Sequence, residues 1–502
     1  MSVKQLFHHQ TVVDLASVAV RKKVNQAEQG LITGLTSLTP IQHWFFEQNL
    51  LEPHHWNQAV LLEVKQVLDL TVLEKSIKQL LLHHDTLRLR FEQTESGWQQ
   101  VIANSDVETP LTYFDFSKLS ESEQELAIEA SATKLQASLN LSASPLIRVA
   151  LFDLGQYQLS RLLVIVHHLA VDGVSWRILL EDLETVYQQF SQDKKIQLPA
   201  KTTSFKYWSE YLHKYVKSAT LQQEWDYWLT EEWQQIAPLP VDFPDGDNTV
   251  ASVENVSISL TVEQTQALLK EVPKAYNTQI NDVLLTALIE AFSQWTGSKS
   301  LLLALEGHGR EEIFDDVDLS RTVGWFTSIF PVLLDLEKVS NTIESLKLIK
   351  EQLRGIPNKG IGYSVLRYLS QDIAKVELLR LLPRPEVVFN YLGQFDRTFS
   401  DSSIFKILQN SPGQTRSLSN RETYMLSIDA LVIDNQLRVD WTYSKNIHRR
   451  STIEKLAKGF LEALLLLVIH CQSSEDRGYT PSDFPEADLS QQDLERFLGK
   501  IN

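Results

Sequence analysis

Cysteine is almost missing from this chain of 502 residues, because Cys471 is the only one. A single thiol excludes both a disulfide-stapled scaffold and a cysteine-rich zinc site. Long apolar runs are missing too: the longest, residues 463–469, is far shorter than the roughly 20 residues that a membrane-spanning helix needs. The first ten residues, MSVKQLFHHQ, lack the apolar core of a signal peptide. We therefore expect a soluble, cytoplasmic protein that does not enter a membrane.

Positive charge is in deficit, since 47 Lys and Arg residues face 64 Asp and Glu residues and the formal net charge is -17. This balance argues against binding to nucleic acids or to anionic membrane surfaces. With 43% hydrophobic and 22% charged residues, the composition is that of a globular protein. At roughly 100–200 residues per domain, the length predicts three domains or two large lobes with appendages.

The most informative stretch is residues 161–190, which read RLLVIVHHLAVDGVSWRILLEDLETVYQQF. Its apolar start predicts a strand buried on both faces, and the later helical spacing of apolar residues predicts an amphipathic helix. His167 and His168 follow the strand, and Asp172-Gly173 closes the corner before the helix. An imidazole at the end of a rigid strand can transfer protons near neutral pH. The alternative for such a pair is one structural and one exposed histidine.

Two further apolar stretches end in polar corners. Residues 301–310 read LLLALEGHGR and place Glu306 at the end of a predicted strand, while EVVFNYLGQFD at 386–396 places Asn390-Tyr391 in the same way. Polar strand ends from distant parts of the chain predict one shared site at a lobe interface. The alternative for Glu306 is a helix cap or an ion pair with Arg310 or another neighbour.

These motifs resemble, in order, the signatures of the epimerization domains of nonribosomal peptide synthetases, which belong to the condensation-domain superfamily. The matching stretches are TPIQHWFFE at 39–47, HHDTLRLRF at 83–91, HHLAVDG at 167–173, EGHGRE at 306–311, RTVGWFTSIFP at 321–331, NKGIGYSVLRYL at 358–369 and FNYLGQFD at 389–396. The resemblance implies an α/β fold of two chloramphenicol-acetyltransferase-like lobes in a V-shaped pseudo-dimer. It also implies an isomerase that inverts the α-carbon of an L-aminoacyl or peptidyl thioester, for use in antibiotic biosynthesis. The thioester would be carried on the 4'-phosphopantetheine of a peptidyl carrier domain.

The resemblance also assigns roles to residues. It implies acid–base roles for His168 and Glu306, and enolate positioning or proton shuttling for Asn390 and Tyr391. Structural roles at the site fall to His167, Asp172, Gly173 and Arg88, and residues lining the substrate or its arm are Trp325, Gly324 and Ser175. The match at 83–91 implies that Arg88 pairs with Asp172, and a guanidinium is a suitable partner for a buried carboxylate. We expect no metal and no bound cofactor.

The same resemblance divides the chain. Its parts are the last helix of a peptidyl carrier domain (1–20), a linker (21–38), an N-terminal lobe (39–200), a C-terminal lobe (201–472) and an intermodular tail with one short helix (473–502). Expected partners are an upstream carrier domain and adenylation domain of the same synthetase and a downstream condensation domain or module, and we expect a monomer. Two alternatives stay open: a condensation domain that joins two carrier-bound substrates, and a catalytically inactive carrier-docking module.

Overall fold

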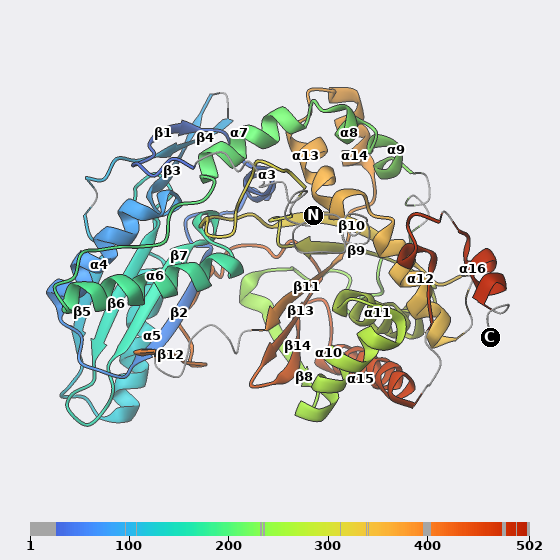
Figure 1. The fold of residues 1–502 in the computed structure, drawn as a ribbon. Coiled ribbons are helices and arrows are strands. Elements are labelled where there is room, and N and C mark those ends of the chain that lie inside the picture. The colour runs from blue at the N-terminus through green and yellow to red at the C-terminus, as the bar shows by residue number, and fades with distance from the viewer. Residues whose placement is uncertain are drawn as a thin grey trace, which may run out of the picture.

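The computed structural model describes residues 27–498 except 96, 107, 231–232, 234–235, 312, 338, 340, 395–402, 474–477 and 488. Within these residues two α/β lobes lie side by side, each built on a β-sheet (Figure 1). The predicted mixed α/β architecture of two lobes is thereby confirmed. The predicted carrier-domain helix at 1–20 lies outside the described residues. None of the described helices is long and apolar enough to cross a membrane.

The N-terminal lobe has a five-stranded sheet in the order β12-β2-β7-β6-β5. Its strands are β2 (Asn57–Val64), β5 (Leu111–Asp115), β6 (Ile147–Asp153), β7 (Arg161–His167) and β12 (Phe405–Ile407). Alternate residues of β7 join two different cores. Val164 and Val166 pack with helices α4 (Leu70–His83) and α6 (Gly173–Ser191), and Ile165 packs with α5 (Glu121–Gln136) on the opposite face. The apolar run of β7 is therefore buried on both faces, as predicted.

A small second sheet adjoins this lobe, in the order β1-β4-β3. It contains β1 (Gly34–Thr36), β3 (Leu89–Thr94) and β4 (Gly97–Ile102), and helix α3 (Pro40–Glu47) follows β1. The predicted linker at 21–38 is therefore wrong at its C-terminal end, because residues 34–36 pair with β4. Ile32 and Leu38 on either side are buried in the core, which explains why this stretch is not free.

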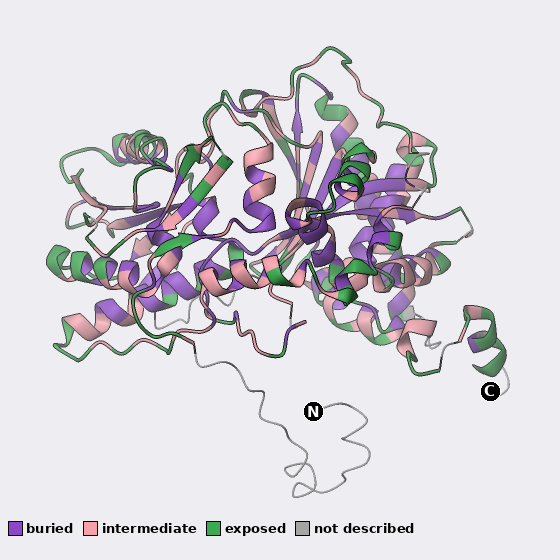
Figure 2. Cartoon of the chain, turned by 90° about the horizontal axis from the view of Figure 1, so that it is seen from above, coloured by how far each residue is buried: buried purple, intermediate pink, exposed green. Residues whose placement is uncertain are grey.

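The C-terminal lobe has a six-stranded sheet in the order β10-β9-β11-β13-β14-β8. Its strands are β8 (Val253–Ser259), β9 (Ser300–Gly307), β10 (Ser328–Asp335), β11 (Val387–Gln394), β13 (Leu426–Ile433) and β14 (Gln436–Ser444). Its main helices are α10 (Val262–Tyr276), α11 (Ile280–Thr296), α12 (Thr342–Arg354) and α15 (Arg450–Ser473). Phe292 of α11 stacks on Trp441 of β14, which meets Phe460 of α15 edge-on, so these two helices cover the sheet. Figure 2 shows that buried residues concentrate in the strands and inner helix faces of both lobes.

Shorter helices complete the chain. They are α7 (Phe205–Tyr215), α8 (Ala219–Gln222), α9 (Trp225–Trp228), α13 (Ile361–Leu369), α14 (Ile373–Leu381) and α16 (Gln491–Leu498). The single-turn helices are η1 (Asp85–Arg88), η2 (His168–Ala170), η4 (Val250–Ser252), η5 (Pro357–Gly360) and η6 (Pro481–Asp483). Trp208, Trp225 and Trp228 of helices α7 and α9 are buried in the core.

One segment between β11 and β13 of the C-terminal lobe, residues 403–424, crosses to the N-terminal lobe, and we call it the strap. Its strand β12 pairs antiparallel with β2 of the N-terminal lobe. Further along, Arg416 forms a β-bridge with Trp56, and the amide of Asn57 donates to the carbonyl of Thr415 at 2.9 Å. The predicted division at residues 200 and 201 is therefore wrong for the strap, which belongs to the N-terminal sheet. A three-residue strand carries too little sequence pattern to be predicted.

The predicted tail at 473–502 is bonded to the C-terminal lobe at several residues, with the largest set of hydrogen bonds at Asp483. Asp483 accepts hydrogen bonds from Lys350 Nζ at 2.7 and 2.8 Å and from Asn277 at 2.6 Å. Lys350 is buried and also donates to the carbonyl of Tyr276 at 3.0 Å. A buried ion pair with this many hydrogen bonds holds the tail in one place. The tail, predicted as a linker with one short helix, thus packs against the C-terminal lobe and contains the short helix α16 (Gln491–Leu498).

Candidate active site

His168 lies at the corner between β7 and α6, and two contacts fix its ring. The ring stacks on the indole of Trp325, with centroids 4.0 Å apart. Its Nδ1 lies 2.9 Å from the carbonyl oxygen of Val171. Because a carbonyl can only accept, Nδ1 carries the proton and Nε2 has the free lone pair. Burial lowers the pKa of His168, so the ring is a neutral proton acceptor at pH 7.

His167 has a different environment and is fully buried. Its Nδ1 accepts from the amide of Leu169 at 3.1 Å, and its Nε2 donates to the carbonyl of Pro53 at 2.9 Å. Burial lowers the pKa of His167 to about 3. With both nitrogens bonded to backbone, His167 fits the structural role predicted for it.

Glu306 lies near the end of β9, in register with Ile329 of β10. Its Oε2 accepts a hydrogen bond from Asn390 Nδ2 at 2.9 Å. Burial, and secondarily the charge of Asp429, raise the pKa of Glu306 to about 8. The carboxyl group is therefore protonated at pH 7 and can give up a proton. The alternative of an ion pair between Glu306 and Arg310 is not what the structure shows, because Arg310 binds elsewhere.

A row of polar residues runs from this corner across the C-terminal sheet. Asn390 of β11 is in register with Asp429 of β13, which is in turn in register with Asp440 of β14. Burial, and then the charge of Asp440, raise the pKa of Asp429 to about 6. Like charges directly opposite each other destabilise a sheet. The row therefore makes negative charge on Glu306 unfavourable.

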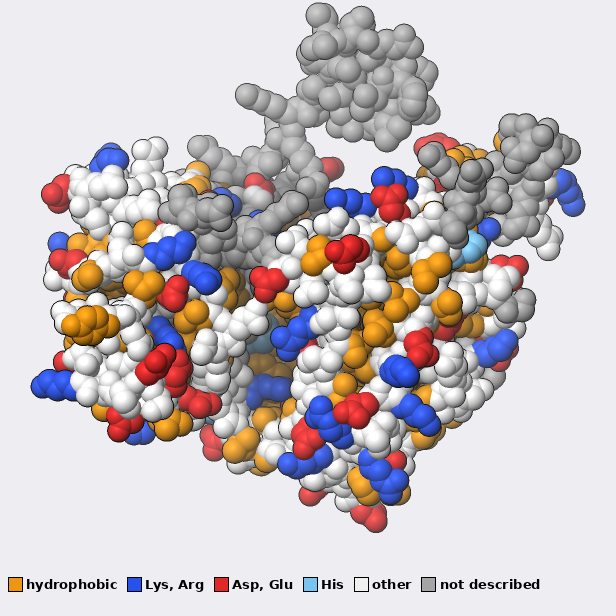
Figure 3. Space-filling model, turned by 90° about the horizontal axis from the view of Figure 1, so that it is seen from below, with side chains coloured by type: hydrophobic (Ala, Val, Ile, Leu, Met, Phe, Trp, Pro, Cys, Tyr) orange, Lys and Arg blue, Asp and Glu red, His pale blue; other side chains and the backbone are white. Residues whose placement is uncertain are grey.

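Aromatic residues connect the two corners. Trp325, which covers His168, meets Trp44 of α3 edge-on at 6.2 Å. Burial, and then the charge of Glu306, raise the pKa of Tyr424, which also hydrogen-bonds Trp44. Trp44 and Tyr424 line a cavity of about 290 Å³ that also touches Ala304 of β9. Figure 3 shows the surface hollowed between the two lobes, with hydrophobic side chains inside.

Ala304 and Glu306 are two residues apart on β9, so they point to the same face of the sheet. The cavity therefore lies on the face that carries Glu306, and α3 and α13 form its other walls. Arg367 of α13 pairs with Glu47 of α3 at 3.0 Å inside it. The lining combines apolar and aromatic side chains with charged ones, among them four arginines, Arg367, Arg380, Arg384 and Arg421.

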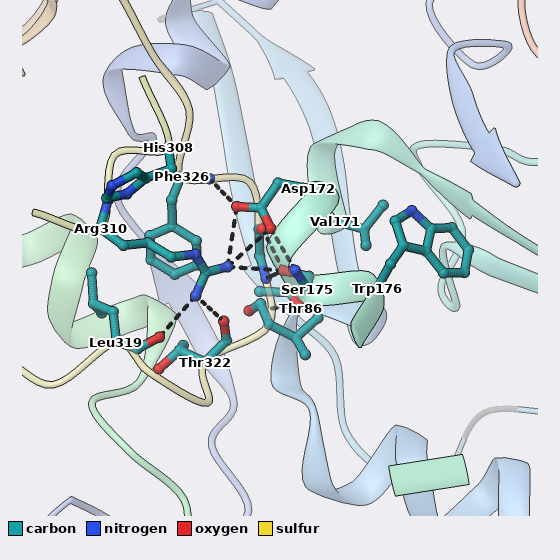
Figure 4. A network of polar contacts seen from close by, with 12 residues as sticks. Thr86, Val171, Asp172, Ser175, Trp176, His308, Arg310, Leu319, Thr322 and Phe326 are labelled. Atoms are coloured by element: carbon teal, nitrogen blue, oxygen red, sulfur yellow. Dashed lines mark hydrogen bonds and ion pairs between the residues drawn. The ribbon is translucent and has the colours of Figure 1, made fainter. Parts of the chain in front are cut away.

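Asp172 does not pair with Arg88 as predicted. Its carboxylate accepts from Arg310 Nη2 at 3.0 and 3.1 Å, from the amide of Ser175 at 2.7 Å and from the amide of Phe326 at 3.2 Å (Figure 4). Asp172 also caps α6. The bond to Arg310 joins the lobes, and we call this set of contacts the clamp. Asp172 is thus structural, as expected, but with another partner.

Arg88 is fully buried within the N-terminal lobe. It donates to Asp85 at 2.7 Å and to three backbone carbonyls, those of Leu81, Ile32 and Ala103. These four hydrogen bonds hold the guanidinium group within the N-terminal lobe, where its carboxylate partner is Asp85 and not Asp172. Its structural role is local to η1 and β4.

The three residues predicted to line the substrate have different positions. Trp325 stacks on His168. Ser175 and Gly324 instead belong to the clamp: the Ser175 hydroxyl donates to the Gly324 carbonyl at 3.0 Å and accepts from its amide at 3.1 Å. Both are buried between the lobes, so neither lines an open channel. Gly324 has φ +159°, and a Cβ there would lie 2.6 Å from the Phe205 ring, which explains the glycine.

Two other predicted residues are placed less tightly. Gly173 begins α6, is exposed, and a Cβ there would meet no atom within 4 Å. Tyr391 is half-buried against the core beside Asn390, just before a register shift in β11. Burial raises the pKa of Tyr391, so its hydroxyl keeps its proton.

Sequence reasoning missed Gln58, at the start of β2. Its Nε2 lies 3.1 Å from Nε2 of His168, and its Oε1 accepts from the indole of Trp176 at 2.7 Å. Gln58 is in register with Val166 of β7, next to the histidine corner. An uncharged glutamine at the start of a strand carries no signal of function in the sequence.

His83 and His84 form a second histidine pair. With Asp182 it forms the one group in the described part of the chain whose possible metal-ligand atoms lie within 4.8 Å of one another. Asp182 already pairs with Arg321 at 2.5 Å and with His84 at 3.0 Å. A carboxylate shared by a guanidinium is a poor ligand for a cation.

Comparison with known proteins gives consistent relatives. The family profile described as "Condensation domain" matches residues 32–490. Linear gramicidin synthase subunits C and B of Brevibacillus parabrevis are each 46% identical to this chain and cover 100% and 99% of it. The chain spans only 6% and 10% of those two proteins.

Among solved structures, the epimerization domain from the third module of tyrocidine synthetase B is 39% identical, with a TM-score of 0.84. The match covers 90% of this chain and 100% of that domain. The X-domain from teicoplanin biosynthesis has a TM-score of 0.68 at 16% identity over 90% of this chain and 97% of its own. That second likeness is one of fold.

Proposed function

Because the chain belongs to the condensation-domain family, we propose that it is an epimerase acting on a carrier-bound thioester. It converts an L-aminoacyl or peptidyl thioester, held on 4'-phosphopantetheine, into the D-configured thioester. One observation carries the proposal. Two strand ends from opposite lobes provide a neutral imidazole that can accept a proton, that of His168, and a protonated carboxyl group that can donate one, that of Glu306. The likeness to a solved epimerization domain over its whole length supports it.

Inversion needs a proton acceptor on one side of the α-carbon and a proton donor on the other. Nε2 of His168 takes the α-proton, and the electron pair of the broken C–H bond moves onto the thioester carbonyl as an enolate. Glu306 then returns its proton to the opposite face of the α-carbon. A thioester helps, because its α-proton is more acidic than that of an amide. Each positioned group contributes about 10²–10⁴-fold in rate.

The enolate oxygen needs hydrogen-bond donors in a dry site. Asn390 beside Glu306 is one such donor. The indole Nε1 of Trp325 is a second: it is buried and has no partner among the described residues. Tyr391, next to Asn390 within β11, keeps the proton on its hydroxyl and is a third candidate. None of these groups requires a metal or an organic cofactor.

One turnover exchanges the protonation states, leaving an imidazolium at His168 and a carboxylate at Glu306. That form has the groups required for the reverse inversion. The enzyme therefore interconverts the two epimers, and a later step must select the D form. We propose that carrier and adenylation domains of the same synthetase supply the substrate and that a downstream condensation domain or module consumes the product.

The test loads an L-aminoacyl group as a pantetheine thioester and incubates it with the chain in deuterated water. We expect deuterium to enter at the α-carbon and the D-epimer to accumulate, as followed by mass spectrometry and chiral chromatography. A condensation domain would instead form an amide with a second, amine-bearing thioester and leave the α-proton in place. A docking module would do neither, and either result would refute the proposal.

A further inference from the structure

We propose that Gln58 is a positioning residue that holds His168 in the form that accepts a proton at Nε2. The inference builds on the proposed function, because it concerns the residue to which that function assigns the α-proton. Its structural content is separate: it specifies which nitrogen of one ring carries the proton, and that can be measured without any turnover.

Three hydrogen bonds run in one direction through this corner. The indole Nε1 of Trp176 lies 2.7 Å from Gln58 Oε1, and an indole can only donate. The Gln58 carbonyl oxygen must therefore face Trp176, which turns its NH₂ group toward His168. Nε2 of His168, 3.1 Å away, must accept. Nδ1 then donates to the carbonyl of Val171, which can only accept.

Trp176 can only donate and the carbonyl of Val171 can only accept. The direction of the bond between Gln58 and His168 therefore cannot be reversed without losing a hydrogen bond. If His168 gains a proton at Nε2, that N–H meets the N–H of Gln58. Turning the Gln58 amide over would relieve the conflict, but its NH₂ group would then meet the N–H of Trp176. Either way one buried donor loses its acceptor, which is unfavourable. Gln58 and Trp176 together therefore disfavour the protonated ring.

Other charged and titratable groups face His168 without touching Nε2. Asp172 at the start of α6 favours the imidazolium, but its oxygens are already bonded to Arg310 of the C-terminal lobe. Arg416 of the strap disfavours it, and neutral His167 lies next to it on β7. Trp325 covers the ring face without a charge. Among the contacts described for this corner, the one at Nε2 is that of Gln58.

Gln58 also occupies the lone pair that the reaction uses. The α-hydrogen of the substrate must replace the Gln58 N–H at Nε2 before transfer. After transfer, the new Nε2–H lacks an acceptor in Gln58, so the imidazolium is not trapped. The predicted effect falls on kcat and its pH dependence, and KM changes little.

The experiment measures the protonation of His168 by NMR on protein carrying ¹⁵N-labelled histidine. The chain has 13 histidines, so the His168 signals are assigned by their loss in His168→Gln. The test variants are Gln58→Glu, which can accept from both Trp176 and a protonated ring, and Trp176→Phe, which removes the donor that orients Gln58. The control is Gln99→Glu, which adds the same charge at an exposed position on β4.

In the unchanged protein we expect a protonated Nδ1 and a free Nε2. Gln58→Glu should raise the pKa of His168 by at least one unit and lower kcat at pH 7 by tenfold or more. Trp176→Phe should raise that pKa by less, and Gln99→Glu should leave it unchanged. Circular dichroism confirms folding, and Trp176→Phe keeps the inference testable if Gln58→Glu does not fold.

Two results would overturn the inference: a protonated Nε2 in the unchanged protein, or a His168 pKa that is the same in both test variants as in the control. The expected titrations in a protein that exchanges no α-proton would support the role of Gln58 and refute the proposed function instead. The two claims therefore fail separately.

Discussion

The histidine corner and the glutamate corner are built in opposite ways. His168 is surrounded by uncharged partners whose hydrogen bonds all run in one direction, through Gln58 to the ring and on to Val171. Glu306 lies beside Asn390 in a sheet that carries two further carboxyl groups, Asp429 and Asp440, in register. One corner works by the geometry of donors and acceptors, and the other by crowding of acidic groups.

The comparison teaches that burial is the largest cause of the pKa shift in both halves of a proton-transfer pair. Burial disfavours charge, so it lowers the pKa of an imidazole and raises that of a carboxyl group. At pH 7 the imidazole of His168 is then neutral and the carboxyl group of Glu306 is protonated. Neither group carries a charge that the resting protein would have to neutralise. The lobes differ in the means used, and the predictions below test that difference.

The largest expected effect comes from removing either group. His168→Gln and Glu306→Gln should each reduce inversion by about 10²–10⁴-fold. The two variants should differ in proton exchange, because each keeps one acid–base group, which can act on one face of the α-carbon. Glu306→Gln should still exchange the α-proton of the L-thioester through His168, and His168→Gln that of the D-thioester through Glu306. Mass spectrometry of both epimers in deuterated water measures this.

If both variants exchange the protons of the same epimer, the two corners do not serve opposite faces and the comparison fails. The matched control is His83→Gln, in the second histidine pair, which should leave inversion unchanged.

The clamp between the corners is the next largest effect. Removing one partner of a buried ion pair is destabilising by about 3–5 kcal/mol, so Arg310→Met should lower the free energy of unfolding by about that amount. Asp172 would then be left without its guanidinium partner between the lobes. Urea unfolding measures the loss.

For comparison, Arg450 and Glu454 form an exposed pair on α15, with 57% and 50% of their side chains exposed. Arg450→Met should change stability by no more than about 0.5 kcal/mol. Equal effects of the two substitutions would show that Arg310 does not hold the lobes together.

The acidic corner should make stability depend on pH. Glu306 has a pKa of about 8 in the folded chain, well above its ordinary value. Between those two values the unfolded chain loses this proton and the folded chain keeps it, so the contribution of Glu306 to stability falls as pH rises. Glu306→Gln removes that contribution. The stability of the variant relative to the parent should increase from pH 5 to pH 8, by at most about 1.4 kcal/mol per pH unit.

Urea unfolding at several pH values measures this difference. Glu462→Gln, at an exposed position on α15, is the control and should show no such trend. A flat difference for Glu306→Gln would mean that burial does not keep this carboxyl group protonated.

The smallest effect concerns the neighbour of Glu306. Asp429→Asn removes a negative charge that helps to raise the pKa of Glu306. That pKa should fall, by about one unit or less because burial is the larger cause. The alkaline limit of the rate of inversion from the L- to the D-thioester should move to lower pH by the same amount, as a pH–rate profile would measure. A shift toward higher pH would contradict the role given to the acidic row.

Much of the fold could be predicted from local patterns. The apolar run before His167 has β-branched residues, and the spacing after it is helical, so strand, corner and helix were predicted as they occur. Glu306 was predicted at a strand end and lies next to the end of β9. Asn390 was predicted at a strand end too but lies inside β11, and the two side chains meet there. Local patterns succeed here because the strands are fully buried.

Long-range pairing could not be read in the same way. Arg88 and Arg310 are both suitable partners for a carboxylate, and sequence alone does not tell which one faces Asp172. The structure decides it: Arg310 binds Asp172, while Arg88 binds Asp85 and three carbonyls of its own lobe. The strap and Gln58 were missed since neither a three-residue strand nor an uncharged amide stands out in a sequence.

The strap limits how this molecule can move. Strand β12 pairs with β2 of the N-terminal sheet, and Glu184 accepts from the amide of Ile404 at 2.9 Å. A hinge motion that separated the two lobes would therefore have to break the pairing of β12. A large partner must therefore deliver its substrate into the site on a narrow arm, because the two lobes do not separate to admit it. Separating the two lobes by cutting the chain between them would also remove the edge strand β12 from the N-terminal sheet. We therefore expect that neither lobe is stable alone in solution.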